Sequence, residues 1–166
     1  GKCGKINDAV RVFDGLTIKD VVAWNAIVAV FTRNGFLVNA LQLFKQMKQE
    51  AIVADKVTFI CMLDASIEHL SVSEVQKVHV FMISHGFISD VMVGTSLINM
   101  YGKCGSIYDA ENVFRVFLQL SSVPWNAMLS IYVDQGHSEK ALLLYRQMHF
   151  EGVSFDGQTY AIILQA

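Results

Sequence analysis

Apolar residues recur along the chain with the spacing of one face of an α-helix. The first stripe lies in residues 21–33 and consists of Trp24, Ile27, Val28 and Phe31. This i, i+3, i+4, i+7 order predicts an amphipathic helix. Gly35 ends the pattern, because glycine readily takes the left-handed conformation that closes a helix. Residues 37–49 carry a second stripe of the same kind, so residues 21–55 are expected to form a helix–turn–helix hairpin.

The same plan returns further along the chain. In residues 56–90, the stripe of the first helix is Phe59, Met62, Leu63 and Ile67, and that of the second is Val75, Val78, His79 and Met82. Residues 91–121 are expected to hold a shorter hairpin that is divided at Gly105. The chain has one proline in 166 residues, which favours uninterrupted helices because proline removes a backbone donor and clashes with the preceding turn.

The sequence also repeats itself at an offset of 101 residues. GKCG occurs at 1–4 and again at 102–105, and WNA occurs at 24–26 and again at 125–127. When residues 1–65 are placed on 102–166 without a gap, 24 of the 65 positions are identical. A period of 101 is too long for one solenoid unit, which has about 20–50 residues. It divides into hairpins of 35, 35 and 31 residues.

These hairpins predict the fold class and the organisation of the whole chain. The expected repeats are a partial one at 1–20, complete ones at 21–55, 56–90, 91–121 and 122–156, and a partial one at 157–166. Each hairpin buries one helix face on its neighbours, so stacking creates the core. We therefore expect an all-α protein, a right-handed α-solenoid of antiparallel helix–turn–helix repeats.

Hairpins that alternate in this way resemble the P, L and S repeats of the plant pentatricopeptide repeat family. The P-like motif is VVAWNAIVAVFTRNGFLVNALQLFKQMKQEAIVAD at 21–55, the L-like repeat at 56–90 contains KVH and HGFISD, and VMVGTSLINMYGKCGSIYDAENVF begins the S-like repeat at 91. By the same resemblance, 122–156 is P-like, 1–20 a partial S-like and 157–166 a partial L-like repeat. Tetratricopeptide repeats fit less well, because their period is fixed at about 34 residues and their motif differs.

The resemblance implies binding of single-stranded RNA, with one base for each repeat. In this family the fifth and the last residue of a repeat read the base edge. The corresponding pairs are Asn25 with Asp55, Ile60 with Asp90, Thr95 with Ser121, and Asn126 with Asp156. The second residue of each repeat packs on the base face, and these sandwiching residues are Val22, Val57, Met92 and Val123.

The reading pairs also imply a base preference. Asparagine followed by aspartate favours uridine in the family, and an amide offers both a donor and an acceptor to a pyrimidine edge. Thr95 is typical of a purine, although Ser121 stands where the family has Asn or Asp. Ile60 has no polar atom in its side chain, so its repeat is expected to act as a spacer. The footprint along the chain is then U–n–purine–U.

The charge of the chain disagrees with strong RNA binding. The net charge is −2, whereas phosphate neutralisation usually gives RNA-binding proteins a basic excess. The thirteenth residue of each repeat faces the RNA backbone in the family. Phosphate-facing basic residues are Lys2, Arg33 and Lys103, and the other two places hold Glu68 and Asp134. We expect weak contact with phosphate in the repeats at 56–90 and 122–156.

Other chemistry finds little support in the sequence. Trp24 and Trp125 are expected to pack in the core rather than to stack on bases, and an interior asparagine such as Asn25 could instead link two helices. Three cysteines without a close pair argue against a disulfide framework. Neither a metal site nor a cofactor motif is present, so no cofactor, no small-molecule substrate and no enzymatic activity are expected. The longest apolar stretch is too short to cross a membrane, and no membrane partner is expected.

The favoured function is a sequence-selective RNA-binding array that acts in organellar RNA processing, editing or stability. The resemblance implies a mitochondrial or chloroplast location, with organellar RNA and editing-complex proteins as partners, although residues 1–20 show no targeting peptide. Two alternatives stay open. One is a protein-binding helical scaffold, since solenoids also present concave surfaces to peptides. The other is a truncated, non-functional remnant of a larger protein of this family.

Overall fold

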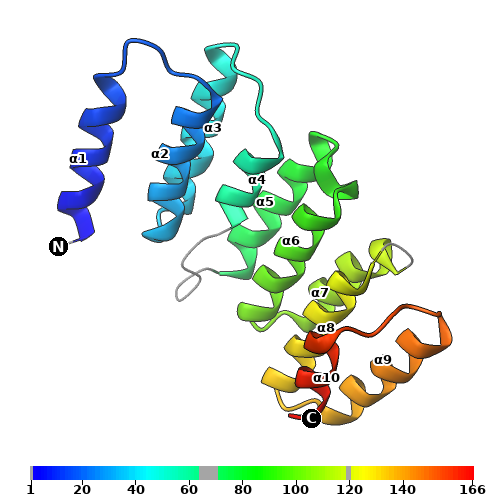
Figure 1. Cartoon of the computed structure of the whole chain (residues 1–166). Helices are drawn as coiled ribbons and strands as arrows, with labels where there is room; N and C mark the ends of the chain where they lie inside the picture. The colour runs from blue at the N-terminus through cyan, green and yellow to red at the C-terminus, as the bar shows by residue number, and fades with distance from the viewer. Residues whose placement is uncertain (1, 64–70, 119–120) are drawn as a thin grey trace. The chain divides into compact units, whose positions relative to one another are not determined.

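The computed structural model describes residues 2–63, 71–118 and 121–166, and these residues form helices and no strand (Figure 1). The chain divides into two compact units, residues 1–74 and 75–166. We call them unit 1 and unit 2. No helix among the described residues is long and apolar enough to cross a membrane.

Unit 1 consists of helices that follow each other as antiparallel neighbours (Figure 1). Its elements are α1 (Lys2–Asp14), α2 (Val21–Arg33), α3 (Leu37–Gln49), α4 (Lys56–Leu63) and the start of α5 (Val72–Ser84). The hairpin predicted for residues 21–55 is confirmed, because α2 and α3 occupy both predicted ranges. Gly35 between them has φ of 85°, which a residue with a Cβ adopts only with strain. Ile67 lies outside the described residues.

Unit 2 repeats this arrangement with one shorter hairpin. It contains the rest of α5, a 3₁₀ turn η2 (Phe87–Ser89), α6 (Val91–Lys103), α7 (Ile107–Phe114), a second 3₁₀ turn η3 (Arg115–Phe117), α8 (Ser122–Asp134), α9 (Ser138–Phe150) and α10 (Gly157–Ile163). The second helix of the short hairpin, α7, has 8 residues, whereas α9 has 13. The division predicted at Gly105 is confirmed, since α6 ends and α7 begins on either side of it.

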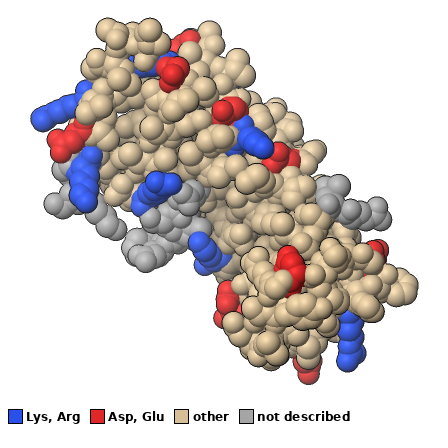
Figure 2. All heavy atoms as spheres, in the orientation of Figure 1, with Lys and Arg blue, Asp and Glu red and all other residues tan. Residues whose placement is uncertain are grey.

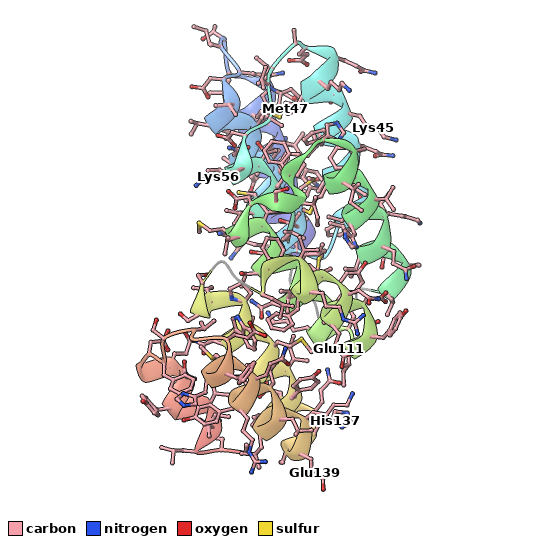
Figure 3. The ribbon with its side chains drawn as sticks, turned by 90° about the vertical axis from the view of Figure 1, so that its right-hand side faces the viewer. Lys45, Met47, Lys56, Glu111, His137 and Glu139 are labelled. Carbon is pink, nitrogen blue, oxygen red and sulfur yellow. The ribbon has the colours of Figure 1, made fainter. Side chains whose placement is uncertain are left out.

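The core of each unit is built around one buried tryptophan. In unit 1, Trp24 meets the edge of Phe13 with ring centroids 4.8 Å apart, and Met47 and Ile27 complete the cluster. Figure 3 shows Met47 among the helices, whereas Lys45 on the same helix points away from them. In unit 2, Trp125 meets Phe114 at 5.0 Å. Both indoles are fully buried, which confirms the expected core role of the two tryptophans.

Side chains tie the far ends of neighbouring first helices together. The Thr32 hydroxyl donates to the Cys61 carbonyl at 2.7 Å and so links α2 to α4 in unit 1. The Gln135 side chain donates to the Gly102 carbonyl at 2.7 Å and links the end of α8 to the end of α6 in unit 2. These bonds fix the ends of the helices opposite to the ends that carry the predicted reading residues.

Candidate nucleic-acid interface

Two asparagines near the starts of α2 and α8 form the same contact in the two units. Asn25 donates from its side-chain amide to a carboxylate oxygen of Asp55 at 3.2 Å. Asn126 donates to both carboxylate oxygens of Asp156, at 3.0 and 3.1 Å. The structure therefore brings together the residues of these two predicted pairs. Each contact joins the first helix of one repeat to the start of the first helix of the following repeat, α2 to α4 in unit 1 and α8 to α10 in unit 2.

Each aspartate is held in place by a threonine three residues further along. The backbone N–H and the hydroxyl of Thr58 both donate to Asp55 Oδ1, at 2.9 and 3.0 Å, and the Asp55 N–H donates back to the hydroxyl at 3.1 Å. Thr159 repeats these contacts with Asp156 at 2.8, 3.0 and 3.3 Å. This reciprocal arrangement is a capping box. It orients the carboxylate while starting the helix.

The charge state of both aspartates follows from these bonds. Burial raises the pKa of Asp55, but hydrogen bonds from the Thr58 backbone, the Asn25 amide, the Thr58 hydroxyl and the Val57 backbone outweigh it and leave that pKa below its ordinary value. The Thr159 backbone N–H is the main cause that lowers the pKa of Asp156. Burial opposes it, and further hydrogen bonds assist it. Because an ionised carboxylate only accepts hydrogen bonds, each asparagine must turn its NH₂ group toward its aspartate.

The asparagine carbonyl oxygens have different surroundings in the two units. In unit 2, Asn126 Oδ1 lies 2.7 Å from the Thr159 hydroxyl, which donates to it. In unit 1, Asn25 Oδ1 is buried and has no hydrogen-bond partner among the described residues. An unsatisfied buried acceptor is costly and calls for an explanation.

An exposed apolar side chain stands one helical turn before each fifth residue. These are the four predicted sandwiching residues, and they are exposed by 68% at Val22, 45% at Val57, 56% at Met92 and 51% at Val123. Residues three apart in a helix share a face, so Val22 lies beside Asn25 and Val123 beside Asn126. An exposed apolar group next to an amide can cover the flat face of a base while the amide meets its edge.

Thr95 and Ser121 are not joined in this way, and Ile60 and Asp90 lie in different units. The Thr95 hydroxyl donates to the Val91 carbonyl of its own helix at 2.7 Å, and the buried Ser121 hydroxyl has no partner among the described residues. Ile60 is half-buried on α4 in unit 1. Asp90, in unit 2, caps α6 by accepting from the Met92 and Val93 N–H groups at 2.9 and 3.2 Å.

Charged residues at the thirteenth place lie at the far ends of the first helices. Arg33 on α2, Lys103 on α6 and Asp134 on α8 are exposed. Lys103 and Asp134 line a hollow of about 410 Å³ in unit 2, together with Asn99, Ser130 and Gln135. The side chain of Lys2 and the whole of Glu68 lie outside the described residues. On the face in Figure 2, basic and acidic side chains are scattered and form no single basic patch.

Sequence reasoning missed the two threonines. Thr58 and Thr159 are identical at the 101-residue offset, and each stands three residues after an aspartate. An aspartate before a helix with a threonine three residues later is a variant of the capping box, whose usual sequence has glutamate or glutamine at that place. Ser122, whose hydroxyl donates to Asp156 Oδ2 at 3.2 Å, left no such signal because the corresponding residue is Val21.

Known proteins resemble this chain in both sequence and fold. Models of the PPR repeat family match residues 19–67 and 120–166, and a PPR repeat model matches 95–120. A pentatricopeptide repeat-containing protein of Arabidopsis thaliana is 36% identical over 99% of the chain, and a chloroplastic one from the same plant is 36% identical over the full chain. A mitochondrial one is 30% identical over 99%. The chain spans 20%, 20% and 26% of these proteins.

The fold has a close counterpart among solved structures. The crystal structure of the pentatricopeptide repeat protein PPR10 in complex with an 18-nucleotide psaJ RNA element superposes with a TM-score of 0.83. The likeness covers 98% of this chain and 25% of PPR10 at 23% identity. A crystal structure of PPR10 from maize gives a TM-score of 0.81. The helical hairpins are thus those of an α-solenoid, and with its family-model matches the chain belongs to the pentatricopeptide repeat (PPR) family.

Proposed function

We propose that this chain binds single-stranded RNA, with one base for each repeat, and that the repeats at 21–55 and 122–156 each select uridine. One observation carries the proposal. In both the Asn25–Asp55 and the Asn126–Asp156 pair the amide donates to the carboxylate, and an exposed valine stands one turn before each asparagine. The PPR family and the RNA complex of PPR10 support RNA as the ligand.

The preference for uridine follows from the orientation of the amide. The aspartate takes up an N–H of the asparagine, so Oδ1 is the acceptor that would meet a base. At Asn126 the Thr159 hydroxyl must first turn away from this oxygen. Uracil presents its N3–H donor between two carbonyl acceptors, so N3–H can donate to Asn Oδ1. Cytosine carries an acceptor at N3, which would face the same oxygen. A buried acceptor that faces another acceptor makes no hydrogen bond, so the cost of removing it from water is not compensated.

The remaining repeats are proposed to contribute less selectivity. Ile60 offers no donor or acceptor, so the repeat at 56–90 would accept any base. Thr95 with Ser121 would favour a purine, and the footprint is U–n–purine–U. Lys2, Arg33 and Lys103 would contact phosphates. The repeats are proposed to be of the P, L and S types with the boundaries 21–55, 56–90, 91–121 and 122–156. Helices α2, α4, α6 and α8 begin at the first residues of these four repeats.

The cellular setting is proposed from the relatives. Several are named chloroplastic or mitochondrial, so we place this chain in an organelle. There it would act in RNA processing, editing or stability, with organellar RNA and editing-complex proteins as partners. A role as a protein-binding scaffold ranks second, because the two aligned Asn–Asp pairs favour RNA.

Fluorescence anisotropy with short labelled RNAs tests the proposal. We expect U–n–A–U to bind more tightly than the same RNA with C at both U positions. Asn25→Ala with Asn126→Ala should abolish this preference, because both acceptors are removed. Asn39→Ala, at an exposed place on α3, is the matched control and should leave it unchanged. Binding that ignores both the base and the two asparagines, with circular dichroism showing a folded protein, would refute base reading.

A further inference from the structure

Thr58 and Thr159 have a contact pattern that points beyond helix capping. We propose that they are positioning residues for uridine selection, in which the hydroxyl alternates between the asparagine oxygen and the aspartate oxygen. The inference rests on the proposed function, because it concerns the same pairs. It assigns a role to the third residue after each of the two Asn–Asp pairs.

The Thr159 hydroxyl lies within hydrogen-bond distance of two acceptors. Asn126 Oδ1 is at 2.7 Å and Asp156 Oδ1 at 3.0 Å. A hydroxyl has one proton, so it can donate to only one of them at a time. Rotation about the C–O bond alone is enough to change the acceptor, since both oxygens are already in range. In unit 2 the unbound array can therefore satisfy Asn126 Oδ1 internally.

Unit 1 shows the other arrangement. The Thr58 hydroxyl lies 3.0 Å from Asp55 Oδ1, and Asn25 Oδ1 is buried without a partner among the described residues. In this arrangement no internal donor occupies Asn25 Oδ1, and the oxygen would accept N3–H of uracil once the side chain turns toward the base. The asparagine oxygen thus accepts from the threonine hydroxyl in unit 2 and not in unit 1. The distances of the cap contacts agree between the two units within about 0.2 Å.

Helix capping alone does not require the hydroxyl. Asp20 caps α2 by accepting from the Ala23 N–H at 2.9 Å, and Asp90 caps α6 through backbone N–H groups with Val93 at the corresponding place. The repeat that contains Ile60 is thus followed at this place by Val93, which has no hydroxyl. The repeat that contains Thr95 is followed there by Pro124, which has none either. Among the complete repeats, a hydroxyl at this place follows only the two repeats whose fifth residue is asparagine.

The test compares valine with serine at both threonines. Thr58→Val with Thr159→Val keeps the shape of the side chain but removes the hydroxyl. We expect it to lower the ratio of the affinities for U–n–A–U and its C-substituted form by roughly tenfold, because the amide and carboxylate are no longer fixed. Thr58→Ser with Thr159→Ser restores the hydroxyl and should keep the ratio within about twofold. The readout is fluorescence anisotropy.

The ratio separates positioning from stability. Loss of folded protein lowers both affinities by the same factor and leaves their ratio unchanged. Val93→Thr, which adds a hydroxyl after Ile60, is the matched control and should leave the ratio at wild-type level. If the valine variant keeps the wild-type ratio, the inference is wrong and the proposed function stands. If the wild-type protein itself shows no preference for U, the proposed function fails first.

Discussion

Asp55 and Asp156 each serve as a helix cap and as the acceptor for a distant asparagine. Both tasks need an ionised carboxylate, because a protonated one would lose acceptor capacity and add a donor. The donors converge on Asp55 from α2 and from α4, so one side chain joins two helices. Loss of the negative charge should then weaken the cap and the interhelical bond together.

Acid should reveal this coupling. The pKa values of Asp55 and Asp156 lie below that of a free aspartate, so the folded state holds the ionised form more strongly than the unfolded state. Their contribution to stability is complete above the ordinary aspartate pKa and is lost as the pH falls through the lowered values. We expect Asp55→Asn with Asp156→Asn to reduce the melting temperature at pH 7.

The same variant should lose less stability than the wild type between pH 5 and pH 3. Thermal denaturation followed by circular dichroism at pH 7, 5 and 3 measures both effects. The remaining carboxylates titrate in both proteins, so the difference between the two curves isolates the pair. Parallel curves over the whole range would show that neither carboxylate is stabilised by its contacts.

Helix α6 approaches its neighbours so closely that two of its positions exclude a side chain. A Cβ at Gly102 would lie 2.4 Å from Ile131 on α8, and a Cβ at Gly94 would lie 2.2 Å from the ring of Phe117 in η3. The glycines thus allow α6 to pack against both elements. Because overpacked cores respond by shifting backbone and side chains, these positions set the spacing of the hairpins in unit 2.

We expect Gly102→Ala to destabilise the protein by about 1–3 kcal/mol through overpacking. Gly157→Ala is the matched control, because a Cβ there meets no atom within 4 Å, and it should be neutral or stabilising, since alanine favours helices over glycine. Urea unfolding measures both free energies. Adding Ile131→Ala to Gly102→Ala should recover part of the loss. Equal midpoints for the two glycine variants would contradict the close approach.

The sequence predicted the elements better than the contacts between them. Helices α2 and α3 followed from apolar spacing and Gly35, and the buried tryptophans followed from their place on an apolar stripe. The role of Thr58 did not follow, because it depends on how the start of α4 meets α2 across about thirty residues. The different surroundings of Asn25 and Asn126 also arise from tertiary positions, since both segments carry the same Asn, Asp and Thr.

The whole molecule is poor in net positive charge, with 13 basic and 15 acidic residues. Affinity for RNA must then come from a few phosphate contacts together with base stacking and edge contacts. For single strands, each neutralised phosphate adds about 0.7 to the slope of log affinity against log salt. The described residues with a proposed phosphate contact are Arg33 in unit 1 and Lys103 in unit 2, and both are exposed.

Arg33→Ala with Lys103→Ala should therefore reduce that slope by about 1.4, which corresponds to two phosphates. The preference for U over C should survive, because the reading pairs are untouched. Lys45→Ala with Arg146→Ala, on the exposed faces of α3 and α9, removes the same charge away from the proposed interface and serves as the control. Anisotropy titrations at several salt concentrations give the slopes. Equal slopes in both double variants would show that Arg33 and Lys103 do not contact the phosphates.

The one buried indole in each unit has a practical consequence for spectroscopy. Trp24 and Trp125 are the two tryptophans of the chain, and neither is reached by solvent. Exposure of either ring would shift its emission to longer wavelength. A variant with phenylalanine at one of the two positions would leave a single fluorophore in a known unit. The melting of units 1 and 2 could then be followed separately in the intact chain, without any attached dye.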